Sequence, residues 1–141
     1  MVYADYDYYL NEYYGRTITD ADFPRLALHA SQYLDYITMG KARGNADLEP
    51  LKMCCCALAE QYQAIETAEV LAQKSLFAGA ADGAEVQSEA VGSWSRSYRS
   101  GGDSAQSAVQ AAKEGRSVLL DTTKRYLAHT GLLYRGGRCC R

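Results

Sequence analysis

The pattern of apolar and polar side chains predicts helices over most of the chain. In residues 5–14, aromatic and apolar side chains recur at helical spacing and Gly15 follows them, so we expect a short helix that ends there. After Pro24, which fits only near a helix start, the apolar side chains form one stripe that stops before Gly40 and Gly44. A second, longer helix should bury this stripe. Its members are Phe23, Leu26, Ala27, Ala30, Tyr33, Leu34 and Ile37.

Two further helices are expected in the rest of the chain. Asp47 as a cap and Pro50 in the first turn mark the start of a third helix, which should run to about Lys74. A fourth should start near Asp103, and glycine-rich residues 75–103 break the helical pattern between the two. The third helix should bury Leu51, Cys54, Cys55, Leu58, Tyr62 and Ile65. The fourth carries its apolar side chains at Ala105, Ala108, Val109, Ala112, Leu119, Leu120, Tyr126 and Leu127.

The break at 75–103 contains the only tryptophan of the chain. Trp94, Arg96 and Tyr98 occupy alternate positions, so they would share one face of an extended segment. Trp, Tyr and Arg are the side chains that most often anchor protein interfaces. We therefore predict an all-α fold in one domain, residues 1–141. It is a small bundle of three to four helices with a long extended loop or β-hairpin-like arm before the last helix. The alternative is that Trp94 folds back over the core of its own chain.

Tyrosine is concentrated at the start of the chain. Half of the twelve tyrosines lie in the first fourteen residues. Aromatic side chains at helical spacing usually belong to the core, but a cluster this dense is also typical of a subunit interface. Both interpretations stay open at the level of sequence.

Charge is distributed unevenly along the chain. The net charge of −2 divides into −4 over residues 1–50, −3 over 51–112 and +5 over 113–141. An acidic front and a basic end suit head-to-tail contact between copies, and a basic end also suits non-specific contact with nucleic acid. The plainer alternative is a solvated helix end. The basic candidates for contact with DNA or a partner are Lys124, Arg125, Arg135 and Arg138.

The sequence offers no catalytic or metal-binding pattern. Cys54–Cys56, Cys139 and Cys140 are odd in number and lack the spacing of a disulfide framework or a zinc site, so we expect the first three to be reduced and packed as small apolar groups. His29 and His129 have no Cys or carboxylate at ligand spacing, and phosphate-binding and nucleophile motifs are missing. We therefore predict neither an enzyme nor a cofactor or metal.

No apolar run approaches the roughly 20 residues of a membrane helix, and the N-terminus lacks the features of a secretion signal. We therefore expect no membrane segment and a cytosolic origin.

Three segments have an order and spacing similar to those of one known family. The first contains YADY at 3–6, DFPRLA at 22–27, and ASQYLD at 30–35 with Thr38. The second is ALAE at 57–60, and the third is SEAVGSWSRSY at 88–98 with GLLYRG at 131–136. Together they resemble the head–tail connector proteins of tailed bacteriophages and prophages, also called adaptor or head-completion proteins. Each stretch is short, so the resemblance depends on their combination, which covers most of the chain.

The resemblance implies a helical structural protein of the virion, assembled in the host cytoplasm and without catalysis. Its copies would form a ring, commonly of about a dozen, beneath the portal protein. The ring would extend the DNA channel and bind the next neck or tail-completion protein. The arm would contact a neighbouring subunit, and the basic end would face DNA or a partner. The implied interface residues are Glu89, Val91, Trp94, Arg96 and Tyr98.

Two other functions stay open. The basic end also suits a small helical DNA-associated or regulatory protein. A phage assembly factor that never joins the virion would show the same features.

Overall fold

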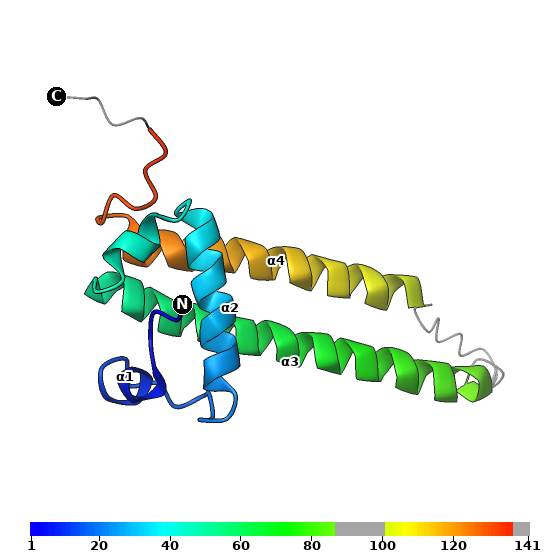
Figure 1. Ribbon diagram of the computed structural model, residues 1–141. Coiled ribbons are helices and arrows are strands. Elements are labelled where there is room, and N and C mark those ends of the chain that lie inside the picture. Colours follow the sequence, from blue (N-terminus) through cyan, green and yellow to red (C-terminus); the bar gives the residue numbers. More distant parts are fainter. Residues whose placement is uncertain (87–100, 137–141) are drawn as a thin grey trace. The chain divides into compact units, whose positions relative to one another are not determined.

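The computed structural model describes residues 1–86 and 101–136, and side chains are described for these ranges except 75–86, 101–109 and 111–113. These ranges contain helices and no strand, which confirms the expected all-α fold (Figure 1). The elements are α1 (Tyr6–Asn11), α2 (Phe23–Ile37), the 3₁₀ helix η1 (Lys41–Asn45), α3 (Glu49–Val86) and α4 (Gly101–Leu127).

The chain divides into two compact units. The first comprises Met1–Gln63 and Ser117–Arg141, and the second comprises Ala64–Arg116. Helices α3 and α4 therefore contribute to both units. The first unit contains α1, α2 and η1 as well.

In the first unit, α2 crosses the first turns of α3 and the last turns of α4 (Figure 1). The Ser31 hydroxyl on α2 lies 3.5 Å from the Cys55 thiol on α3. The Thr123 hydroxyl of α4 donates to the Leu119 carbonyl at 2.8 Å, and the side chains of Tyr33 on α2 and Cys54 on α3 lie near Thr123. The three helices thus meet at small polar side chains inside an apolar core.

The core largely follows the predicted stripes. On α2, Phe23, Leu26, Ala27, Ala30 and Leu34 are buried as expected, while the other two members of its stripe are half-buried. On α3, six consecutive residues are buried, from Cys54 to Ala59, because this stretch is contacted by α2, by α4 and by the N-terminal segment. A helix covered on several sides must be apolar all round.

The three central cysteines are free thiols buried in this core, as predicted. Burial raises the pKa of Cys54 to about 12 and also raises the pKa values of Cys55 and Cys56. The thiols therefore stay protonated at neutral pH and serve as small packing groups.

Helix α1 begins as its sequence indicates and ends in an unusual way. The Asp5 carboxylate accepts a hydrogen bond from the Tyr8 N–H at 2.9 Å and caps the first turn. Tyr14 adopts a left-handed backbone conformation (φ 59°), which glycine usually adopts at the end of a helix. Gly15 follows because a Cβ at this position would overlap the Tyr9 ring. Leu10, expected on the apolar face, is exposed.

The starts of α2 and α3 lack a capping carboxylate. Asp22 occupies the capping position of α2 without capping it, and its carboxylate accepts a hydrogen bond from the Thr19 hydroxyl at 2.8 Å instead. Helix α3 begins at Glu49, so Leu48 rather than Asp47 directly precedes it.

The predicted break at 75–103 is wrong at its start, because helix α3 continues past Lys74 to Val86. Helix α4 begins at Gly101, close to the predicted start. Alanine-rich sequence has a high intrinsic helix propensity, so the helix persists after the apolar stripe has ended. Residues 87–100 lie outside the described part of the chain, so the arm remains a prediction there.

In the second unit, the later part of α3 and the first part of α4 are antiparallel. Gly115 on α4 faces Ile65 on α3, and a Cβ added at Gly115 would lie 3.1 Å from the Cγ1 and Cδ1 atoms of Ile65. The glycine that weakens α4 by roughly 1 kcal/mol relative to alanine therefore also permits close helix packing here.

Candidate functional site

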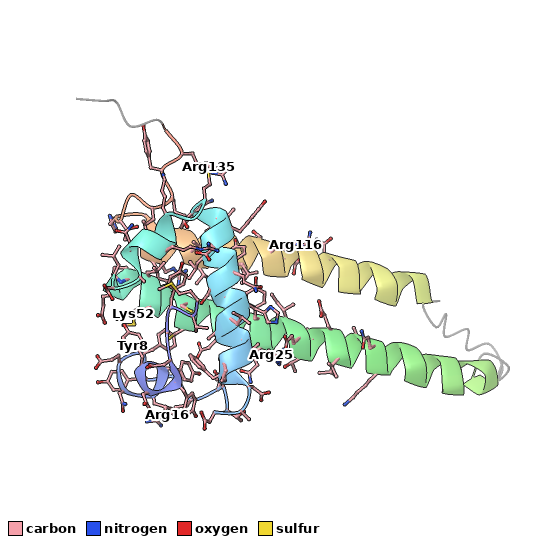
Figure 2. The ribbon with its side chains drawn as sticks, in the orientation of Figure 1. Tyr8, Arg16, Arg25, Lys52, Arg116 and Arg135 are labelled. Carbon is pink, nitrogen blue, oxygen red and sulfur yellow. The ribbon has the colours of Figure 1, made fainter. Side chains whose placement is uncertain are left out.

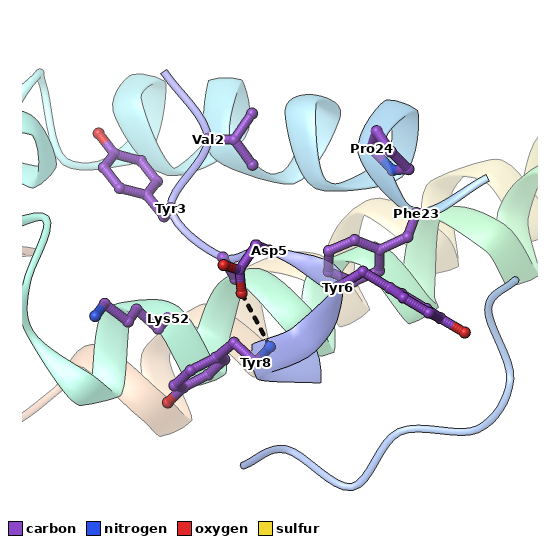
Figure 3. Close-up of a pocket in the computed structure, with 9 residues that line it drawn as sticks. Val2, Tyr3, Asp5, Tyr6, Tyr8, Phe23, Pro24 and Lys52 are labelled. Atoms are coloured by element: carbon purple, nitrogen blue, oxygen red, sulfur yellow. Dashed lines mark hydrogen bonds between the residues drawn. The ribbon is translucent and has the colours of Figure 1, made fainter. Parts of the chain in front are cut away.

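The first unit has an open groove beside α1, and four of its nine lining residues are aromatic (Figure 3). Its volume is about 480 Å³, within the usual range for ligand sites of roughly 300–1,000 Å³. We call it the aromatic groove. It is lined by Val2, Tyr3, Ala4, Asp5, Tyr6, Tyr8, Phe23, Pro24 and Lys52.

Three parts of the chain build the groove. The N-terminal segment is held on α2 because the Tyr3 N–H donates to the Ser31 hydroxyl at 3.1 Å. The rings of Tyr6 and Phe23 pack together with their centroids 5.6 Å apart. Lys52 comes from the first turn of α3 and lies beside Tyr8, with its Nζ 5.8 Å from the centre of that ring (Figures 2 and 3). The groove thus depends on residues distant in sequence.

Two tyrosine rings of the groove are fixed because their hydroxyl groups donate to carboxylates. The Tyr3 hydroxyl donates to Asp35, whose other oxygen also binds Arg43 Nε at 3.0 Å. The Tyr8 hydroxyl donates to Glu49 at 2.7 Å. Both rings are therefore fixed before any ligand arrives. Tyr3 is buried, but Tyr8 is half-buried, so its fixed ring lowers the entropy cost of binding.

The surroundings of the groove are predominantly acidic. Burial raises the pKa of Tyr8 above its ordinary value, and so do its hydrogen bond to Glu49 and the negative charges of Glu49 and Glu12. Asp5 lines the groove itself, and Lys52 is the single cation among the lining residues. Tyr8 therefore stays a neutral hydrogen-bond donor at neutral pH, and the groove favours groups that are aromatic or cationic.

Behind the groove, one carboxylate joins α1 and the loop after it to α3. Glu60 accepts hydrogen bonds from the hydroxyls of Tyr9 at 2.8 Å, Thr17 at 2.9 Å and Tyr13 at 3.1 Å. The Tyr9 hydroxyl also accepts from the backbone N–H groups of Thr17 at 3.1 Å and Ile18 at 3.3 Å. This network holds α1, which carries one side of the groove.

All five predicted interface residues lie outside the described ranges: Glu89, Val91, Trp94, Arg96 and Tyr98. So does Arg138, one of the four basic candidates for contact with DNA or a partner. The other three basic candidates are exposed: Lys124 and Arg125 in the last turn of α4, and Arg135 in the segment beyond it (Figure 2). Lys124 lies 4.0 Å from Asp121 on the same helix, and the described contacts do not join these three bases to one another.

Sequence reasoning found part of the aromatic groove and missed the rest. The density of tyrosine in the first fourteen residues was the usable signal, since Tyr3, Tyr6 and Tyr8 all line it. Pro24 and Lys52 were missed as members because their place beside the N-terminal segment depends on how α2 and α3 pack.

The remaining chemistry of the described residues is sparse. His29 is exposed on α2, with its ring centroid 6.0 Å from that of Tyr62, and His129 is exposed after α4. In residues 1–86 and 101–136, no three His, Cys, Asp or Glu side chains gather as metal ligands would. Within the same ranges, no helix combines the length and the apolar character needed to cross a membrane.

A scan against protein-family models found no match. Searches of curated proteins and of solved structures found no match either.

Proposed function

We propose that this chain is a structural subunit of a tailed phage or prophage, which forms a ring between the portal protein and the next neck or tail component. The observation that carries the proposal is a pair of complementary features in one chain. Residues 1–50, which supply every lining residue of the aromatic groove except Lys52, carry a net charge of −4, and residues 113–141 carry +5. A ring requires such heterologous contacts, in which one patch meets a different patch on the next copy.

The groove supports binding in preference to bond-making chemistry. Its lining contains aromatic rings, one ammonium and one carboxylate, and neither histidine nor cysteine. The raised pKa of Tyr8 keeps that phenol protonated at neutral pH, so it is a poor general base. The resemblance of the three segments to head–tail connector proteins supports the same non-catalytic role.

Assembly with the portal tests the proposal. The purified chain would be mixed with the portal protein encoded in the same genome and examined by electron microscopy and light scattering. We expect stoichiometric complexes in which the chain forms a closed ring on the portal. If the chain shows no stoichiometric binding to the portal and remains monomeric beside it, the proposal is wrong. Mass spectrometry of purified particles then separates a virion subunit from an assembly factor.

A second candidate function is non-specific DNA binding. It is favoured by the exposed bases Lys124, Arg125 and Arg135, and by Lys41, which donates a hydrogen bond to the Tyr134 carbonyl next to Arg135. Gel shifts at increasing salt test this function, because phosphate contacts weaken steeply with ionic strength. A shift at low salt that K124E/R125E removes would support it. Failure to bind DNA even at low ionic strength would exclude it.

A further inference from the structure

The aromatic groove has the chemistry of a site for a peptide that carries aromatic and guanidinium groups. The half-buried rings of Tyr6 and Tyr8 can attract aromatic side chains by stacking and cations through the ring quadrupole, whereas the Phe23 ring is buried. Planar guanidinium groups use both interactions and also pair with carboxylates. Asp5 in the lining and Glu49 at the Tyr8 hydroxyl supply those carboxylates. An acidic or purely aliphatic ligand would leave these features unused.

One segment of the chain matches this chemistry closely. Residues 94–99, WSRSYR, contain two aromatic and two guanidinium side chains and no acid. Arginine also adjoins an aromatic residue at Arg125–Tyr126 and at Tyr134–Arg135, but each of these pairs supplies a single ring and a single guanidinium. Tyr126 is already half-buried on α4. The final basic residues, Arg138 and Arg141, have cysteine and glycine neighbours and no aromatic partner.

We propose that the aromatic groove binds residues 94–99 of a second copy of this chain. The choice of a second copy rests on the proposed ring, in which each subunit meets the next through unlike patches. Trp94 and Tyr98 stack on the half-buried rings of Tyr6 and Tyr8, and Arg96 and Arg99 approach the acidic rim. Because the groove rings are already oriented by Asp35 and Glu49, the incoming segment bears most of the ordering cost.

Site-specific photo-crosslinking in the full-length chain tests the inference directly. Val2 lines the groove and is 45% exposed, so a p-benzoylphenylalanine there can report the occupant without replacing an aromatic ring. The labelled chain would be mixed with an isotopically heavy copy and with portal, irradiated and analysed by mass spectrometry. We expect crosslinks from the light copy to heavy peptides that contain Trp94 or Tyr98.

The outcomes separate this inference from the proposed function. Rings on the portal whose crosslinks fall elsewhere, for example on residues 134–141, overturn the groove assignment and leave the ring. Crosslinks only within one copy also overturn it. Heavy-copy crosslinks to residues 94–99 without ring formation support the groove and contradict the ring. If neither rings nor heavy-copy crosslinks to residues 94–99 are seen, the groove assignment and the proposed ring are both overturned.

A peptide titration adds a sign-specific test. A fluorescent peptide of residues 87–100 should bind the full chain saturably, and W94A in the peptide should weaken binding at least about tenfold, since buried aromatic anchors dominate such contacts. K52E in the protein removes the cation among the lining residues and should tighten binding roughly threefold. K74E is the matched control because Lys74 is exposed on the same helix and outside the groove. Equal effects of K52E and K74E, or equal binding of the W94A peptide, would overturn the assignment.

Discussion

Removing the Glu60 carboxylate should destabilise the first unit by detaching α1 from α3. Glu60 accepts three hydroxyl hydrogen bonds, from Tyr9, Tyr13 and Thr17. In E60A these donors lose a charged acceptor at once. The Tyr9 side chain is fully buried, so its hydroxyl cannot simply turn to water, although the Thr17 hydroxyl remains 3.0 Å away as a weaker partner.

The size of the effect follows from the exposure of the three donors. A hydrogen bond to a charged group contributes about 1.5–3 kcal/mol, and three would give an upper limit of roughly 4.5–9 kcal/mol. Tyr13 is half-buried and Thr17 is exposed, so water can replace much of their share. We therefore expect E60A to lower the free energy of unfolding by about 2–3 kcal/mol. E60Q keeps one acceptor oxygen for Tyr9 and should cost about 1 kcal/mol.

Urea unfolding followed by far-ultraviolet circular dichroism measures these differences, and near-ultraviolet circular dichroism reports the tyrosine environment. E69A is the matched control, because Glu69 is exposed on the same helix and its loss should change stability by less than about 0.5 kcal/mol. If E60A unfolds like E69A, the Glu60 network does not hold α1, and the proposed rigidity of the groove loses its basis.

Three further predictions concern backbone conformation, packing and the buried thiols. Y14G should raise the free energy of unfolding by about 0.5–1 kcal/mol in urea titrations, because Tyr14 is 77% exposed and left-handed; destabilisation would show that the ring makes a contact of its own. G115A alone should change the free energy of unfolding by less than about 0.5 kcal/mol, because the higher helix propensity of alanine is opposed by the 3.1 Å contact with Ile65. In an I65A background the same change should raise the free energy of unfolding by about 1 kcal/mol. Additive effects in this double-mutant cycle would contradict the prediction. With the two C-terminal cysteines replaced by serine, the native chain should resist iodoacetamide at pH 8 until urea unfolds it. Burial raises the pKa of Cys54 from 9.0 to about 12, so folding favours the protonated thiol. This contribution to the free energy of unfolding is complete below pH 9 and is lost as the pH rises toward 12. Rapid native alkylation, or a urea midpoint that does not fall over that range, would show that the thiol is accessible.

The helical layout of the first unit was largely predictable, because helix formation depends on local spacing. The apolar stripe of α2 and the proline near its start indicated a helix whose buried face the structure confirms. Apolar periodicity did not predict where helix α3 ends. Helix α3 runs on to Val86 through alanine-rich sequence, although its apolar stripe stops earlier.

Sequence alone therefore determined the helical class, the main buried stripes and the concentration of tyrosine and negative charge at the front of the chain. It also marked Trp94 and its neighbours as an unusual cluster, although their structure stays a prediction. Only the tertiary structure decided that Tyr3, Tyr8 and Lys52 share one groove, and that Glu60 receives three hydroxyls from the N-terminal region. The physical reason is that helix periodicity is a local property of the chain, whereas a groove depends on the packing of segments that are distant in sequence.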